Sequence, residues 1–183
     1  MSAVGNEALV RRPIMDLVYR LEADFTELVP VGLVPEGIRF DAHFSGRVVK
    51  GPLSGATGRG VDYLLLRSDG VSVLDAYTTI SAETGQHVSV HAQGYTSPPP
   101  EMQLPPPEVI LSPEFRWPDA PIPIHGFALY RTGAEDLAWM NRTALALEGT
   151  VNVGTGKLVL EAWTSRSEVR EQPGSPAVLE ASD

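Results

Sequence analysis

The sequence predicts an all-β fold: a single antiparallel, largely up-and-down β-barrel of about eight strands, with a long proline-rich loop. Several short runs alternate apolar and polar residues with a period of two, and clusters of turn-forming residues separate them. No run shows a convincing long helix. Because a meander that closes into a barrel has no exposed edge strand, we favour a barrel over the main alternative, a two-sheet sandwich.

Eight segments carry the strand pattern. The first two alternate most regularly, with apolar side chains on one face and charged or polar ones on the other. The third and fourth flank the Asp69–Gly70 turn and form the clearest predicted hairpin. The Glu83–Gly85 turn leads into the fifth, and the last three follow a long interruption. In chain order the segments are Asp16–Thr26, Ile38–Val48, Val61–Arg67, Val71–Ile80, His87–Tyr95, Phe127–Arg131, Leu137–Leu147 and Lys157–Thr164.

We expect the chain to have three parts. These are a flexible leader over residues 1–15, a β-barrel domain over residues 16–165 and a disordered tail over residues 166–183. Within the barrel domain, residues 97–125 hold ten of the sixteen prolines, which favours a stiff excursion over a strand. The apolar residues of this segment favour docking over disorder. A lid over the barrel mouth and an oligomer contact are both open as its role.

The composition excludes several classes of function. The formal net charge of -9 argues against a nucleic-acid partner and against docking on an anionic membrane. The chain has no cysteine, which excludes disulfides, thiolate nucleophiles and cysteine-ligated metals. No run approaches the roughly 20 apolar residues of a membrane helix, so we expect a cytoplasmic protein. The expected partner is a small organic ligand, and the apolar proline-rich segment also permits a homodimer.

The histidines raise the question of a metal site. His87 and His91 share a strand face, but four residues along a strand separate them by about 13 Å, which is too far for one ion. We therefore expect no metal and no cofactor. His91 belongs to a polar face that runs from His87 to Tyr95. We favour an interpretation in which this face meets water over one in which it lines a polar lumen, with His91 as an acid or base.

Two carboxylates stand out because each shares a strand face with apolar residues. Asp62 alternates with leucines, and Asp75 alternates with valines and Tyr77. A carboxylate in such surroundings costs several kcal/mol unless it is hydrogen-bonded or protonated. Each is therefore either an anchor for backbone amides or an acid–base group. The anchor role is favoured for Asp62, whereas for Asp75 we predict a catalytic acid or base with Tyr77 as its donor partner.

The predicted ligand contacts are Asp62, His91 and four further residues. Trp139 and Asn141 would share a strand face and give a ligand an apolar wall and a hydrogen-bonding amide. In the alternative interpretation, Trp139 plugs one end of the barrel and Asn141 satisfies buried backbone groups. Arg131 is predicted as a partner of Asp75 or of an anionic ligand group, although a surface role is commoner for arginine. Tyr63 follows Asp62 directly and completes the set.

Several motifs resemble the bacterial domain-of-unknown-function family 3237, over a span from about Leu17 to Trp163. The resemblance implies a calycin-like β-barrel and implies no particular activity. The chain differs from the family pattern at Tyr63, where the family usually has tryptophan, and at Tyr77, where it usually has arginine. These differences and the long proline-rich insert imply that this member has its own substrate. The motifs are Gly51-Pro52-Leu53-Ser54-Gly55, Gly60-Val61-Asp62-Tyr63, Asp69-Gly70, Leu74-Asp75-Ala76 and Ala138-Trp139-Met140-Asn141.

These observations predict a small-molecule-binding barrel. We favour a cofactor-independent acid–base enzyme, such as a lyase, isomerase, hydratase or cyclase, that acts on an apolar or aromatic, polyketide-like metabolite. The alternatives are a non-catalytic carrier or sensor and a structural barrel whose lumen is filled. A packed lumen would exclude binding and catalysis, whereas a cavity of roughly 300 Å³ or more would support them.

Overall fold

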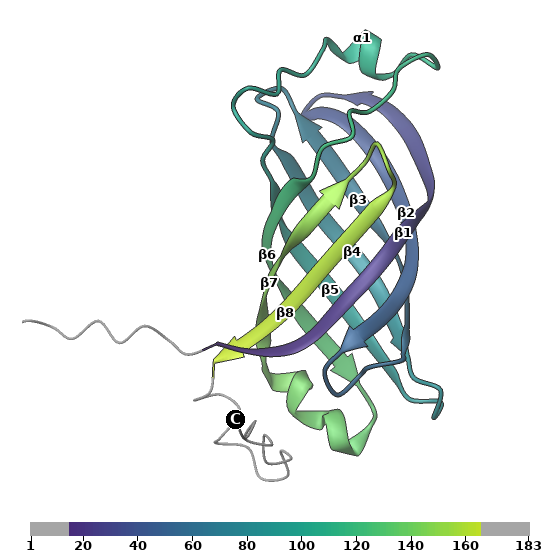
Figure 1. Ribbon diagram of the computed structural model, residues 1–183, viewed down its shortest axis with the longest axis vertical. Coiled ribbons are helices and arrows are strands. Elements are labelled where there is room, and N and C mark those ends of the chain that lie inside the picture. The colour runs from purple at the N-terminus through teal and green to yellow at the C-terminus, as the bar shows by residue number, and fades with distance from the viewer. Residues whose placement is uncertain (1–14, 166–183) are drawn as a thin grey trace, which may run out of the picture.

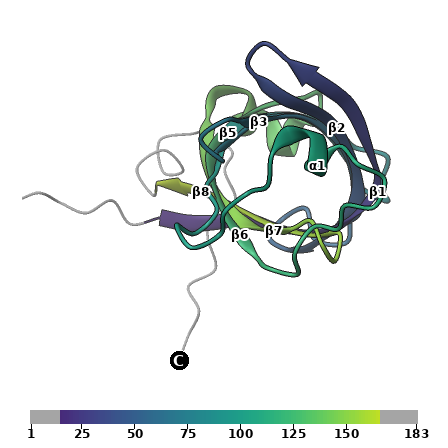
Figure 2. The ribbon, with the colours of Figure 1, turned by 90° about the horizontal axis from the view of Figure 1, so that it is seen from above.

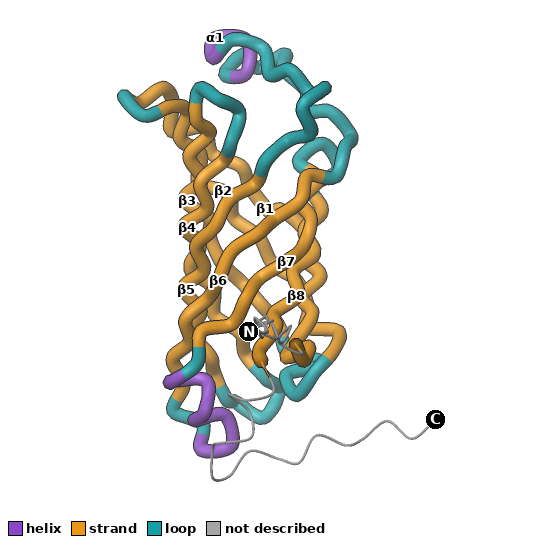
Figure 3. The backbone as a smooth tube through the Cα atoms, turned by 90° about the vertical axis from the view of Figure 1, so that its left-hand side faces the viewer, coloured by secondary structure: helices purple, strands orange, loops and turns teal. Residues whose placement is uncertain are grey.

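Eight antiparallel strands form a closed barrel (Figure 1). The computed structural model describes residues 15–165. Each strand pairs with its neighbours in the chain, and β8 pairs with β1, which confirms the predicted all-β, up-and-down barrel. Short helical segments lie at its two ends (Figure 3). The elements are β1 (Met15–Val34), β2 (Gly37–Lys50), β3 (Thr57–Arg67), β4 (Ser72–Ser81), β5 (His87–Thr96), α1 (Pro107–Ile110), β6 (Ile122–Thr132), η1 (Glu135–Arg142), β7 (Ala144–Asn152) and β8 (Lys157–Ser165).

The alternation along each strand determines which side chains enter the barrel. In β2, Ile38, Phe40, Ala42 and Phe44 are each at most 4% exposed, and the residues between them are half-buried. Alternate positions of β1 and of β5 to β8 are buried in the same way and supply most of the main core cluster, whereas most positions of β3 and β4 are half-buried. Because burial of one large apolar side chain contributes roughly 1.5–3 kcal/mol, this inward face drives closure of the sheet.

Four strands extend by four residues or more beyond their predicted bounds. β1 continues to Val34, β3 begins at Thr57, β6 begins at Ile122 and β7 continues to Asn152. Two of these extensions, in β1 and β6, contain a proline, which argues against a strand in the sequence pattern. The second half of β1 is in register with β2 alone, and Ile122 and Pro123 pair with β7 before the pairing with β5 begins. A strand segment with one unpaired side tolerates proline, because no ladder hydrogen bond is lost.

The predicted strand Leu137–Leu147 is wrong in its first half. Residues Glu135–Arg142 form the 3-10 helix η1, and β7 begins at Ala144. The buried residues of η1, Leu137 and Met140, are three positions apart, which is the repeat of a 3-10 helix. Both belong to the main core cluster, so η1 closes one end of the barrel.

The proline-rich segment crosses the opposite end of the barrel (Figure 2). Its helix α1 inserts Ile110 into a small cluster that contains Ile38, Phe40 and Leu66. Trp117 packs edge-on against Phe40, with the ring centroids 5.9 Å apart. The segment therefore covers the barrel mouth with apolar side chains.

Two contacts fasten the proline-rich segment to the turn between β7 and β8. The Nδ2 of Asn152 donates a hydrogen bond to the Oδ1 of Asp119 over 2.7 Å. Gly154 approaches Pro118 so closely that a Cβ at Gly154 would lie 2.5 Å from the Pro118 carbonyl oxygen. Such an approach requires glycine.

The predicted tail, and all of the predicted leader except Met15, lie outside the described residues. Met15 itself is the first residue of β1. Within residues 15–165, no helix is long and apolar enough to cross a membrane.

We expect Gly154→Ala to loosen the proline-rich segment, because the new methyl group needs the space that Pro118 occupies. Limited trypsin digestion measures this through cleavage after the exposed Arg116, which we expect to be several-fold faster in the variant. The matched control is Gly133→Ala, since a Cβ at Gly133 meets no atom within 4 Å. Equal cleavage rates in all three proteins would show that the contact with Gly154 does not hold the segment.

Candidate functional site in the barrel lumen

A cavity of about 110 Å³ lies inside the barrel. Inward-facing residues of all eight strands line it, and Pro98, Leu104 and Trp117 of the proline-rich segment border it at the mouth. This volume is below the roughly 300 Å³ of the smaller ligand pockets. It is closer to an apolar cavity of about 150 Å³ that holds benzene. The lumen is therefore not filled.

A row of alanines keeps the middle of the lumen open. The strand register aligns Ala42, Asp62, Ala76, Ala92 and Ala128 across five neighbouring strands. Large inward-facing side chains fill an eight-stranded barrel, so the small side chains of this row leave space beside the carboxyl group. Three of the alanines, Ala42, Ala76 and Ala92, line the cavity, whereas Ala128 is buried and does not. The sequence thus creates the cavity at the level of Asp62.

Asp62 is the ionisable group of this lumen. Among the residues that line the cavity, it is the one side chain that can carry a charge near neutral pH. Its Oδ1 accepts a hydrogen bond of 2.9 Å from the backbone N–H of Asp75, on the adjacent strand. Its Oδ2 has no hydrogen-bond partner within the described part of the chain. One oxygen therefore anchors the side chain to the sheet, and the other is available to a ligand.

The surroundings raise the pKa of Asp62 from 3.8 to about 6. Burial is the largest cause, because an apolar environment penalises the charged carboxylate. The hydrogen bond from the Asp75 backbone lowers this pKa, the charge of the Asp75 carboxylate raises it, and the charge of Arg39 lowers it. Asp62 therefore changes protonation just below neutral pH, where one group can serve as an acid or a base.

Two tyrosines form a second polar group inside the barrel. The hydroxyl oxygens of Tyr19 and Tyr130 share a hydrogen bond of 3.0 Å, and the rings meet edge to face. Both residues are buried, and Tyr19 also lines the cavity. Burial raises the pKa of Tyr19 to about 12 and the pKa of Tyr130 well above its usual value, so both phenols stay neutral.

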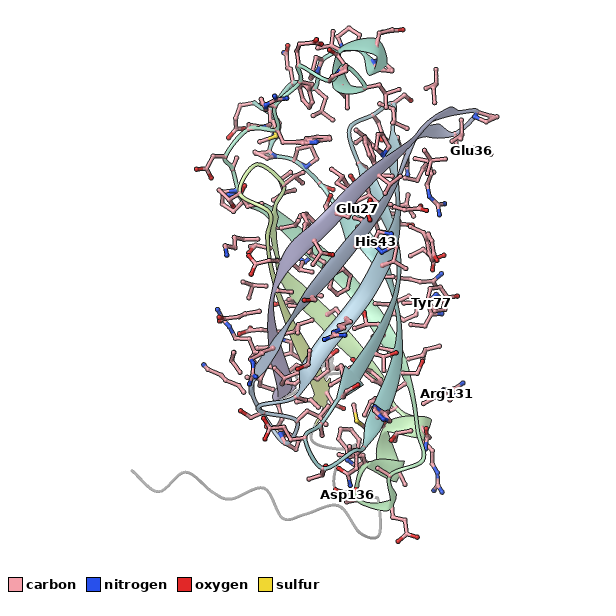
Figure 4. All side chains as sticks on the ribbon, turned by 90° about the vertical axis from the view of Figure 1, so that its right-hand side faces the viewer. Glu27, Glu36, His43, Tyr77, Arg131 and Asp136 are labelled. Atoms are coloured by element: carbon pink, nitrogen blue, oxygen red, sulfur yellow. The ribbon has the colours of Figure 1, made fainter. Side chains whose placement is uncertain are left out.

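Four of the predicted site residues come together, but on the outer face of the barrel. The Nε2 of His91 lies 2.7 Å from the Oδ1 of Asp75 in a hydrogen bond. The Tyr77 ring stacks on His91 with 4.3 Å between centroids, and Tyr63 meets Tyr77 edge-on at 6.3 Å. Tyr77 is 49% exposed and points away from the barrel (Figure 4). We call these four residues the outer cluster.

The outer cluster does not line the cavity. On β4 the lumen positions belong to Leu74, Ala76 and Thr78, so Asp75 and Tyr77 face outward. Most of the polar face of β5 likewise faces outward, while Val88 and Val90 are buried. Gln93 of that face also borders the cavity. The catalytic roles of Asp75 and Tyr77 and the ligand contacts of Tyr63 and His91 stay predictions.

Two further predicted residues lie on η1 instead of on a strand. Trp139 packs against the core at the closed end of the barrel. The side-chain amide of Asn141 accepts a hydrogen bond from the Thr132 N–H over 2.8 Å and donates one to the Thr132 carbonyl over 2.9 Å. Neither residue lines the cavity. Their positions agree with the alternative of an end plug and a backbone cap.

Arg131 lies on the outer surface, where it points away from the barrel (Figure 4). Its Nη1 donates to the carbonyl oxygen of Tyr130. The register places Arg131 beside Ser89, whereas Asp75 pairs with Gln93. Ser89 and Gln93 are four positions apart, which corresponds to about 13 Å along β5. Arg131 therefore does not contact Asp75, and its predicted contact with an anionic ligand group stays a prediction.

Sequence reasoning does not single out the tyrosine pair or the alanine row. The alanines carry a visible signal, because each lies at an inward position of a strand where a large apolar residue is normal. The tyrosines carry a weaker signal. Each lies on the inward face of its strand, where a phenol needs a partner, but no local pattern identifies that partner across 111 residues of sequence.

Comparison with known proteins identifies a family and a fold. A family model described as "Protein of unknown function (DUF3237)" matches residues 13–164. A solved structure of a protein of unknown function from Clostridium acetobutylicum has a TM-score of 0.67 at 18% identity, covering 82% of this chain and 97% of that one. A β-barrel-like protein from Acinetobacter baumannii has a TM-score of 0.58 at 16% identity, with coverages of 85% and 98%. An enzyme from Penicillium herquei has a TM-score of 0.51 at 16% identity, with coverages of 83% and 95%. No curated protein matches the sequence.

We expect Asp62→Asn to stabilise the protein at about pH 8 but not at about pH 4. Folding raises the pKa of Asp62, so protonated Asp62 contributes favourably to the free energy of unfolding. This contribution is fully present below the unfolded pKa of 3.8 and is lost as pH rises through about 6. Asparagine cannot ionise, so it avoids a penalty of roughly 1–3 kcal/mol at the higher pH. Urea denaturation of both proteins measures the free energy of unfolding. An equal difference at both pH values would contradict a raised pKa for this buried carboxyl group.

Proposed function

Since the chain belongs to the DUF3237 family, which its motifs predicted and which is described as proteins of unknown function, we propose a function from its lumen. The barrel binds a small, largely apolar molecule, and Asp62 acts on that molecule as an acid or a base without a cofactor. The observation that carries the proposal is a single ionisable carboxyl group in a mostly apolar cavity.

The surroundings of Asp62 support acid–base chemistry. The Asp75 N–H fixes one oxygen of the carboxyl group, so the group needs little reorganisation when a ligand enters. The mostly apolar lining strengthens the interaction of the second oxygen with a bound molecule. A pKa of about 6 leaves the group partly protonated near neutral pH, which suits removal of a proton at one position and its return at another.

Two alternative functions are compatible with the same barrel. A carrier or sensor would bind the same kind of molecule without converting it, and a structural barrel would bind nothing. The cavity of about 110 Å³ is smaller than the roughly 300 Å³ expected of a ligand pocket, but an unfilled lumen favours binding over the structural role. The Penicillium herquei protein is described as an enzyme, which supports catalysis as one use of this fold. Turnover of a probe substrate separates an enzyme from a carrier.

We expect the protein to catalyse the ring opening of benzisoxazole, a one-step reaction that needs only a base. The carboxylate removes the proton on the ring carbon next to nitrogen, the N–O bond breaks, and a cyanophenol forms. The rate, measured by the absorbance of the cyanophenol, is expected to rise with pH through about 6 as Asp62 loses its proton. Asp62→Asn should lower this rate by roughly a hundredfold or more.

Asp75→Asn is the matched control, because it changes a carboxylate on the outer face and leaves the lumen side chains in place. We expect this variant to keep most of the activity. If Asp75→Asn lost the activity and Asp62→Asn kept it, the reaction would belong to the outer cluster and the proposal would be wrong.

Filling the lumen tests the location of binding independently of catalysis. We expect Ala92→Phe to abolish binding of ethylbenzene, because the phenyl ring occupies the space that the alanine row leaves open. Ser89→Phe adds the same ring to the exposed face of the same strand and should leave binding unchanged. Calorimetric titration of each folded variant provides the measurement. Equal affinity in both variants would place the binding site outside the lumen.

A further inference from the structure

The tyrosine pair lies at the end of the barrel that η1 closes. Tyr19 is near the start of β1, and Tyr130 is near the end of β6, just before the chain enters η1. Their hydroxyl oxygens are 3.0 Å apart, and Tyr130 has no exposed surface. Two phenols thus meet in a region from which water is largely excluded.

One of the two hydroxyl hydrogens of this pair has no acceptor within the pair. Two hydroxyl groups carry two hydrogens, and the bond between them uses one. Within residues 15–165, neither hydroxyl has another hydrogen-bond partner. A buried donor that stays unpaired costs about 1–3 kcal/mol, so such a group normally has an acceptor.

The direction of the shared bond decides where the free hydrogen lies. Tyr19 lines the cavity, whereas Tyr130 lies behind it. The free hydrogen can reach a ligand when Tyr130 donates to Tyr19 and Tyr19 donates into the lumen. Because donors in a chain polarise one another, this order also makes the Tyr19 hydroxyl the stronger donor.

We propose that the Tyr19–Tyr130 pair is a binding site for the carbonyl oxygen of an uncharged ligand, with Tyr19 as the donor. This inference rests on the proposed function, since it assumes that the lumen holds the ligand. It goes beyond that function because it names a second polar contact and the chemical class that the contact selects.

The charges in the lumen favour a neutral carbonyl over an anionic oxygen. No lysine, arginine or histidine is among the residues that line the cavity, so a carboxylate or phosphate would enter without a counterion. Burial raises the pKa of both phenols, which keeps them as donors across the physiological range. A carbonyl oxygen accepts such a hydrogen without carrying charge into the barrel.

The test compares two ligands of nearly equal size, acetophenone and ethylbenzene, of which only the first has a carbonyl group. We expect Tyr19→Phe to weaken acetophenone binding by roughly three- to tenfold, the usual value of one hydrogen bond. Ethylbenzene binding should stay within about twofold of the wild type, because it cannot accept that hydrogen. Tyr130→Phe should affect acetophenone less, since Tyr19 keeps its hydroxyl group.

Infrared spectroscopy of acetophenone bound to the wild-type protein provides a measurement that needs no variant. We expect the carbonyl stretching frequency to be lower than in hexane, and to return toward the hexane value in Tyr19→Phe. A bound carbonyl with the hexane frequency, or an equal loss of affinity for both ligands in Tyr19→Phe, would overturn the carbonyl site while the proposed function stands. If the wild type bound neither ligand, the proposed function itself would fail.

Discussion

Closure of the sheet through the pairing of β1 with β8 is the constraint on which the rest of the structure depends. Once the barrel is closed, each strand has one face in the lumen and one in solvent, and a single step along the chain changes the face. Asp62 and Asp75 show the consequence. A hydrogen bond joins them through the sheet, yet the first lies in the cavity and the second belongs to the outer cluster.

The lumen combines two features that are unfavourable for stability alone. A cavity of about 110 Å³ corresponds to a loss of roughly 2–3 kcal/mol at the usual cost per unit of empty volume. A buried carboxyl group with a raised pKa adds a further penalty near neutral pH. A small molecule that fills the space and meets Asp62 and Tyr19 offsets both costs. Binding therefore explains why the alanine row and the carboxyl group occur together, whereas a structural barrel would gain from larger side chains.

The sequence predicts the fold better than the site, for physical reasons. Strand alternation depends on neighbouring residues alone, so the sequence predicts β2 and the β3–β4 hairpin correctly. The wrong predictions lie where the local pattern favours a different structure from the one that forms. In η1, the buried residues Leu137 and Met140 are three positions apart, which is the repeat of a 3-10 helix and would place them on opposite faces of a strand. The identity of the site residues depends on which face of each strand points into the barrel. Apolar residues also lie on the outside of this barrel, including the exposed Phe127 and Leu129, so apolar neighbours did not identify the lumen face of β4. The resemblance to the family motifs identified the barrel and could not identify the ligand.

The most direct test of the central claim is methyl NMR of alanine-labelled protein during a titration with ethylbenzene. The methyl groups of Ala76 and Ala92 line the cavity, whereas Ala144 and Ala146 lie exposed on the outer face of β7. If the lumen binds ethylbenzene, the Ala76 and Ala92 signals will shift in a saturable way, and the signals of Ala144 and Ala146 will not change. Saturable shifts confined to Ala144 and Ala146, or no shift at any alanine, would show that the lumen is not a binding site.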